Sequence, residues 1–139
     1  MLFGADRDIL YLEDATEAVK SIDGSRSQGI RQSIEKFLDS PNAAFDKQVE
    51  PHLHQARDLG TNTRAFCTWC VDEDSSRELC VVHTIYDKGD EAKFFAEISE
   101  FNTEGEELKQ QFEELTDEQY AEWIQSMRSN SNFIVVSNE

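Results

Sequence analysis

Three segments with the pattern of β-strands follow one another between residues 52 and 86, and they restrict the possible folds more than any other feature. The segments are residues 52–58, 63–71 and 78–86. They are rich in Val, Ile, Thr and aromatic residues and are separated by polar turns. This spacing predicts a three-stranded antiparallel meander. Large apolar residues recur along it, so we expect one packed face that largely buries Phe66, Trp69 and Val82.

The N-terminal part of the chain combines one strand pattern with two helical patterns. The apolar run at residues 8–12 predicts a first strand. Residues 14–22 and 25–38 carry apolar side chains at helical spacing, and Gly24 between them is a natural stop. The second helix should end before Pro41. We therefore expect an antiparallel helical hairpin, and the chain as a whole is predicted to be an α+β protein.

The C-terminal part is helical in pattern and strongly acidic. Residues 90–139 hold 13 acidic and 3 basic residues, a net charge of −10 out of −16 for the whole chain. Helical patterns cover residues 92–101, 104–115 and 116–127. Residues 133–136 fit either a short terminal strand or a packed tail. These features predict a core over residues 1–98 and an acidic helical extension over residues 99–139 that packs on the core.

Composition excludes several classes of protein. The chain has 139 residues with 38% hydrophobic content, which suits one folded domain, and no run approaches the roughly 20 apolar residues of a membrane span. The first residues lack the features of a signal peptide, and three cysteines are an odd number. We expect a cytoplasmic protein without a disulfide framework. The charge of −16 indicates either no binding to nucleic acid or a halophilic source, because molar salt screens all but contact-range charges.

One cysteine and histidine pattern has the spacing of a zinc site. Cys67 and Cys70 form a Cys-x2-Cys pair, and after nine residues Cys80 and His83 form a Cys-x2-His pair. Thiolate and imidazole are the ligands that tetrahedral zinc prefers. A zinc-binding module that uses these four residues is therefore one possible function.

The preferred interpretation of the same residues is an ordinary β-hairpin without a metal or another cofactor. A turn in the polar stretch between the two pairs places Trp69 opposite Cys80 and Phe66 opposite His83. Strand alternation then puts the first two cysteines on opposite faces of the sheet, where they cannot share one metal ion.

Polar residues suited to phosphate chemistry gather on the three predicted strands. They are His52, His54, Arg57, Arg64, His83, Tyr86 and Lys88. For each residue taken alone, a solvated position at a sheet edge, or a core imidazole with satisfied hydrogen bonds for His83, is the simpler explanation.

The order of elements resembles the RelE/ParE toxin superfamily of type II toxin–antitoxin systems over roughly residues 6–98. The apolar spacing between Ala15 and Pro41 looks like the helical hairpin of that family. Leu53-His54-Gln55-Ala56-Arg57, followed by Arg64-Ala65-Phe66, is similar to the paired-arginine strands of its HigB-like and phage-derived branch. The run from Val81 to Lys88 looks like the last strand of that branch.

The resemblance implies a metal-independent endoribonuclease that cuts mRNA on the ribosome and is neutralised by a cognate antitoxin. Arg57 and Arg64 would then neutralise charge on the phosphate, because guanidinium binds phosphate oxygens bidentately. His83 or Tyr86 would act as general acid or base, with Lys88 assisting and His54 as a weaker candidate. The alternative on the same fold is a non-catalytic protein that binds a protein partner through the sheet or the acidic helices.

Two explanations fit the acidic extension. It provides solubility at high salt, or its helices lie across the sheet and cover the active face. In the second case Glu113, Glu114 or Glu118 would pair with Arg57, Arg64 or Lys88 in place of phosphate. The apolar residues expected to pack are Leu108, Phe112, Leu115, Tyr120, Trp123 and Ile124.

Overall fold

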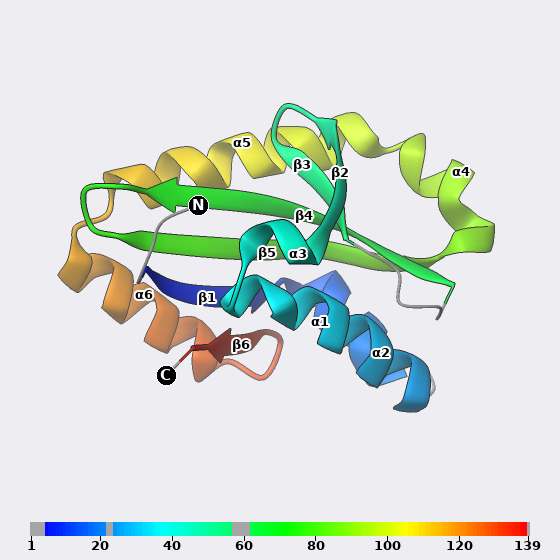
Figure 1. Cartoon of the computed structure of the whole chain (residues 1–139), viewed down its shortest axis with the longest axis horizontal. Helices are drawn as coiled ribbons and strands as arrows, with labels where there is room; N and C mark the ends of the chain where they lie inside the picture. Colours follow the sequence, from blue (N-terminus) through cyan, green and yellow to red (C-terminus); the bar gives the residue numbers. More distant parts are fainter. Residues whose placement is uncertain (1–4, 22–23, 57–61, 139) are drawn as a thin grey trace.

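A six-stranded mixed sheet forms the centre of the molecule (Figure 1). The computed structural model describes residues 5–21, 24–56 and 62–138, without the side chains of residues 25–27. The strands are β1 (Asp6–Tyr11), β2 (Phe45–Glu50), β3 (Leu53–Ala56), β4 (Thr63–Asp72), β5 (Arg77–Asp87) and β6 (Ile134–Ser137). Their order in the sheet is β2-β3-β4-β5-β1-β6. The α+β class predicted from the sequence is confirmed.

In the residues that the structure describes, six α-helices and two 3₁₀ turns accompany the sheet. The helices are α1 (Glu13–Ser21), α2 (Gly24–Glu35), α3 (Pro41–Ala44), α4 (Glu91–Phe95), α5 (Ile98–Glu114) and α6 (Asp117–Arg128). The 3₁₀ turns are Lys36–Leu38 and Lys88–Asp90. In the part of the chain that the structure describes, no helix combines the length and the apolar content needed to cross a bilayer.

The three segments expected to form a meander are the neighbouring antiparallel strands β3, β4 and β5. β1 lies parallel to β5 on the other side, and β6 pairs antiparallel with β1, so residues 134–137 form a terminal strand. β2 was not predicted. Its residues after Phe45 are mostly polar and exposed, and two irregularities interrupt its pairing with β3, so its sequence carries no alternating signal.

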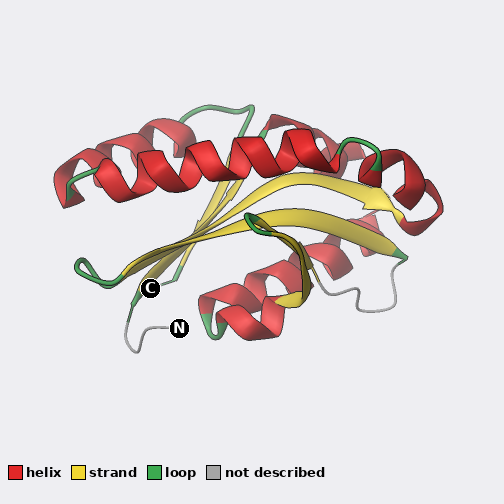
Figure 2. Ribbon diagram, turned by 90° about the horizontal axis from the view of Figure 1, so that it is seen from above, coloured by secondary structure: helices red, strands yellow, loops and turns green. Residues whose placement is uncertain are grey.

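One layer of helices covers each face of the sheet, as Figure 2 shows from above. Helices α1 and α2 pack on one face over a cluster that includes Ile9, Cys67 and Val82. Helices α5 and α6 cover the other face. Apolar residues of these two helices and of the loop between them pack against sheet residues such as Leu10 and Leu79. The helix and loop residues are Leu108, Phe112, Leu115, Tyr120, Trp123 and Ile124.

The predicted register of the β4–β5 hairpin is correct on one side of a bulge and wrong on the other. Trp69 lies opposite Cys80 as expected, but Phe66 lies opposite Thr84 instead of His83. A register shift after Phe66 leaves His83 as the extra residue of β5. Phe66 is fully buried, whereas Trp69 is only partly buried against the cluster under α1 and α2.

The helical boundaries after β5 also differ from the prediction. A turn at residues 96–97 ends α4, and α5 then runs without interruption through residues 101–104, where the sequence predicted a break. Thr116 and Gln119 have the sequence spacing of a capping box, and they form one at the start of α6.

Gly105 permits an unusually close approach of α5 to β4. A Cβ atom added at Gly105 would lie 2.4 Å from Thr68 Oγ1 and 2.8 Å from the carbonyl oxygen of His52. Both distances are shorter than any ordinary contact, so a side chain at this position would displace the helix or the strands beneath it. A glycine in a helix interior normally costs stability, and here it is needed for packing.

We expect Gly105→Ala to lower the free energy of unfolding by about 1–3 kcal/mol, because the new methyl group has no space. Without the close approach, the better helix propensity of alanine would raise stability by up to about 1 kcal/mol. Urea unfolding measures the sign of the change. Gly89→Ala is the matched control, since a Cβ there would meet nothing within 4 Å. An increase in stability for Gly105→Ala would contradict the close contact.

Candidate functional site

Two of the predicted site residues lie directly opposite each other at one end of the sheet. Arg64 of β4 pairs with Tyr86 of β5, and Gln55 of β3 donates a hydrogen bond from Nε2 to the Tyr86 hydroxyl oxygen over 2.9 Å. Glu91 of α4 comes close to the same group. Its Oε2 is 3.8 Å from Arg64 Nε and 3.5 Å from Gln55 Nε2. We call Gln55, Arg64 and Tyr86 the sheet-end site.

Tyr86 is held as a neutral proton donor. It is 3% exposed, and its ring stacks on Phe94 with centroids 4.6 Å apart and an interplanar angle of 14°. Burial raises the pKa of Tyr86 to about 12, and the nearby Glu91 carboxylate also raises it, whereas the hydrogen bond from Gln55 and the charge of Arg64 lower it. Because the hydroxyl oxygen accepts from Gln55, the O–H hydrogen remains available for another acceptor.

The other two predicted cations are placed differently. Lys88 is exposed in the 3₁₀ turn that follows β5, where its backbone N–H donates to the carbonyl oxygen of Asn62 over 2.8 Å. It lies two residues beyond Tyr86 along the chain. Arg57 falls outside the described residues, so the predicted pair of arginines is represented here by Arg64.

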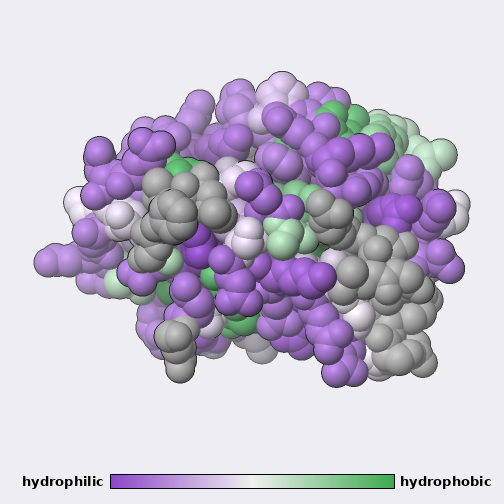
Figure 3. Space-filling view, in the orientation of Figure 1, coloured by the Kyte–Doolittle hydropathy of each residue, from purple (hydrophilic) through white to green (hydrophobic). Residues whose placement is uncertain are grey.

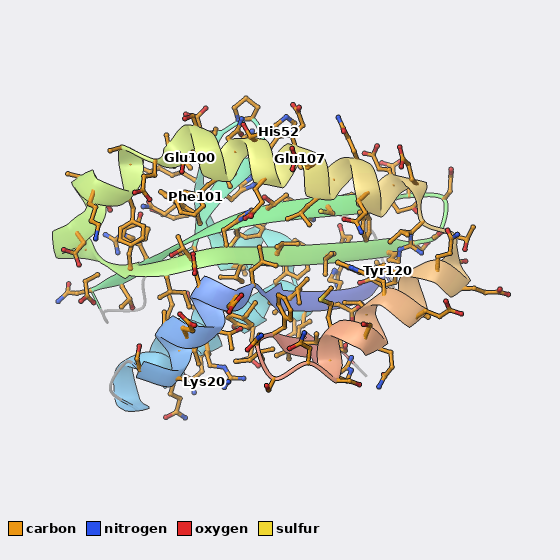
Figure 4. All side chains as sticks on the ribbon, turned by 180° about the vertical axis from the view of Figure 1, so that it is seen from behind. Lys20, His52, Glu100, Phe101, Glu107 and Tyr120 are labelled. Atoms are coloured by element: carbon orange, nitrogen blue, oxygen red, sulfur yellow. The ribbon has the colours of Figure 1, made fainter. Side chains whose placement is uncertain are left out.

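His83 is not brought together with the sheet-end site. Its side chain is fully buried under α5, with Nε2 2.6 Å from Thr68 Oγ1 and Nδ1 2.5 Å from Glu104 Oε1. The rings of Phe101 and Phe66 form a chain of contacts between His83 and Tyr86. Figure 4 labels Phe101 on α5. His83 thus has the environment of a core imidazole whose hydrogen bonds are satisfied.

A cavity of about 360 Å³ opens beside His83, between the start of α1 and helix α5. Carboxylates of both helices line it together with Leu12, Phe101 and Phe133, and these acids are Glu13, Asp14, Glu100 and Glu104.

His54 belongs to the opposite face of the sheet. Its ring stacks on Phe45 with centroids 4.8 Å apart, and it lies edge-on to Trp69. Burial lowers the pKa of His54, and the charge of Lys109 lowers it further. This position separates His54 from Arg64 and Tyr86, so the weaker candidate does not join the site.

The four residues with zinc-site spacing do not converge on one point. Cys67 and Cys80 belong to the cluster under α1 and α2, whereas Cys70 belongs to the cluster under α5 and α6. Burial raises the pKa of Cys70 to about 12 and that of Cys80 in the same direction, which disfavours thiolate ligands. Among the described residues, no group of three His, Cys, Asp or Glu side chains could hold a metal ion.

Carboxylates from residues 91–117 meet basic groups of the sheet and its loops. They form four pairs: Arg64 with Glu91, His83 with Glu104, His52 with Glu106 at 3.0 Å, and Arg77 with Asp117 at 2.8 Å. Figure 4 shows His52 and Glu107 near α5 and Tyr120 near α6. In the described parts of the chain, the expected acids Glu113, Glu114 and Glu118 are not among the ion-pair partners of Arg64 or Lys88, so different carboxylates cover the sheet.

Two residues near Arg64 and Tyr86, namely Gln55 and Glu91, were not predicted from the sequence as site residues. Gln55 lies two residues before Arg57. Strand alternation places it on the same face as Leu53, and this alternation is the signal that could have found it. Glu91 carries no signal in the sequence, because its proximity to Arg64 depends on how the chain turns after β5.

The chain matches no protein-family model, no curated protein and no solved structure.

Glu104→Gln tests the contact between α5 and the buried ring of His83. The hydrogen bond with His83 lowers the pKa of Glu104 below its ordinary value of 4.5, so the ionised carboxylate stabilises the fold above that value. We expect the variant to lose less than about 1 kcal/mol at neutral pH, because the carboxylate is half exposed. The loss should vanish as the pH falls through the lowered pKa. Urea unfolding over a pH series measures it, with Glu107→Gln on the same helix as control, and a loss independent of pH would contradict the assignment.

The environment of Tyr86 predicts an unusual alkaline titration. The chain has three tyrosines, and burial raises the pKa of Tyr11, Tyr86 and Tyr120. The native protein should therefore show little phenolate absorbance near pH 10, and wild type should differ from Tyr86→Phe only near pH 12. The stability that neutral Tyr86 provides is complete below about pH 10 and is lost as the pH rises toward about 12. Phenolate formation by Tyr86 near pH 10 in the folded protein would contradict its burial.

Proposed function

We propose that the protein is a translation-inhibiting toxin that cleaves mRNA at the sheet-end site. The observation that carries the proposal is the opposition of Arg64 and Tyr86, which sets a guanidinium beside a phenol that keeps its proton. Cleavage of a phosphodiester bond is accelerated by both kinds of group. A cation stabilises the charge that develops on the phosphate oxygens, and an acid protonates the departing oxygen.

The proposed reaction uses side chains of the chain itself. The 2′-hydroxyl of the RNA attacks the adjacent phosphorus, its proton passes to water, and the bond from phosphorus to the 5′ oxygen breaks. Arg64 binds the non-bridging oxygens, and Tyr86 gives its proton to the 5′ oxygen that leaves. Gln55 fixes the Tyr86 hydroxyl by donating to it, so that its hydrogen is directed to an acceptor. Lys88, exposed beyond the end of β5, adds positive charge on the path of the RNA backbone.

The partners of such a toxin follow from the resemblance to the RelE/ParE superfamily. A cognate antitoxin would bind the protein and block the site, and the ribosome would present the mRNA. The net charge of −16 suits this activity only if salt screens the long-range repulsion, so the proposal requires a high-salt cytoplasm. Contact-range attraction by Arg64 and Lys88 survives such screening.

A second candidate is a non-catalytic protein that binds a protein partner. The ion pair of Arg64 with Glu91 and the hydrogen bonds of His83 favour it, because both residues are engaged within the chain. In that case the sheet-end site is structural, and its variants affect folding rather than growth.

We expect Arg64→Ala and Tyr86→Phe each to reduce mRNA cleavage in a reconstituted translation system by about a hundredfold or more, and to relieve growth arrest on induction. Tyr86→Phe removes a single hydroxyl group, and thermal unfolding checks that Arg64→Ala, whose side chain is 18% exposed in the native protein, still folds. Arg128→Ala is the control, since Arg128 is an exposed arginine of α6 that contacts Ser137. Unchanged cleavage in both site variants would refute the roles given to Arg64 and Tyr86, and inert expression of the wild type would favour the second candidate.

A further inference from the structure

We propose that α4 is a latch over the sheet-end site, with the Glu91 carboxylate occupying the position of the substrate phosphate. This inference rests on the proposed function, because it concerns the regulation of the same site. It differs from the expectation for the acidic extension, in which carboxylates of the last two helices would cover the site.

The first support is that one carboxylate oxygen faces two of the site's donors. Glu91 Oε2 lies 3.8 Å from Arg64 Nε and 3.5 Å from Gln55 Nε2, while Gln55 also holds the Tyr86 hydroxyl. In the proposed reaction, Arg64 binds the phosphate oxygens and Gln55 donates a hydrogen bond to Tyr86, the proton donor. An anionic oxygen between them has the charge and the size of a phosphate oxygen.

The second support is that α4 covers the apolar side of the same residues. Phe94 stacks on the Tyr86 ring, and Phe95 lies edge-on to Phe66 with centroids 5.4 Å apart. Residues 91, 94 and 95 fall on neighbouring turns of one short helix. RNA cannot reach the Tyr86 hydroxyl by the route above its ring while Phe94 holds this position.

The third support is that α4 is weakly attached. It has five residues, none of them buried, and a 3₁₀ turn and the turn at residues 96–97 separate it from β5 and α5. Figure 3 shows hydrophobic surface where α4 lies. Segments with few buried contacts open at low free energy. The helix can therefore swing away while β4, β5 and α5 stay in place.

The test compares Glu91→Gln with Glu97→Gln in the full-length chain. Both variants remove one negative charge from the same segment, but Glu97 is exposed in the turn after α4. The probe is a fluorescently labelled single-stranded RNA, with binding followed by anisotropy and cleavage by gel at matched salt. We expect Glu91→Gln to bind and cleave about fivefold better than wild type and Glu97→Gln to match wild type. In the background of Arg64→Ala, Glu91→Gln should give no gain, because the latch acts through Arg64.

A second readout needs no RNA. Hydrogen exchange of the backbone amides in residues 91–95 should be faster in Glu91→Gln than in Glu97→Gln, since the contact that holds α4 is lost. If RNA cleavage is absent in all variants but exchange rises, the proposed function fails and the latch remains. If wild type cleaves RNA and Glu91→Gln equals it, or if cleavage falls in Glu91→Gln, the latch is overturned. Equal exchange in the two variants overturns it as well.

Discussion

The close seating of α5 on β4 at Gly105 is the contact on which the rest of this face depends. With no side chain at that position, the helix backbone approaches Thr68 and the carbonyl oxygen of His52. Glu104, the preceding residue, then reaches His83, which the β-bulge has made the extra residue of β5. One turn earlier Phe101 covers Phe66, and two turns later Phe112 enters the cluster beneath α6.

Charge in this molecule is better understood from local pairs than from the total. The chain carries −16, yet acids of residues 91–117 stand next to imidazole or guanidinium groups of the sheet and its loops. Arg77 shows the effect at the far end of the sheet. It is 4% exposed, pairs with Asp72 and Asp117, and lies over the rings of both Phe112 and Tyr120. The acidic segment thus supplies both exposed negative charge and carboxylate partners for basic groups of the sheet and its loops. Net charge alone predicts only the first role.

The sequence predicted the strands whose signal is local and missed features that depend on distant contacts. The β4–β5 hairpin and the capping box of α6 follow from alternation and from Thr116 with Gln119. The bulge at His83 was missed, because one extra residue changes no residue type in the pattern. β2 was missed because it is an edge strand of mostly exposed polar residues, which do not show the apolar alternation of a strand with one buried face. At the candidate site, Arg64 and Tyr86 were predicted from their strands, whereas Glu91 was not, since its position depends on a turn and on the packing of Phe94.

The strength of the latch follows from the size of its contacts. A partly exposed ion pair such as that of Arg64 and Glu91 contributes up to about 1 kcal/mol, and a stacked aromatic pair adds about 1 kcal/mol. Together they favour the closed arrangement by up to about 2 kcal/mol, so at least roughly one molecule in thirty is open. For the proposed toxin, substrate affinity falls by up to the same factor, which slows cleavage without abolishing it. The proposed toxin activity therefore still calls for a separate antitoxin, because complete protection of a cell requires a partner whose binding free energy far exceeds what five residues of α4 provide.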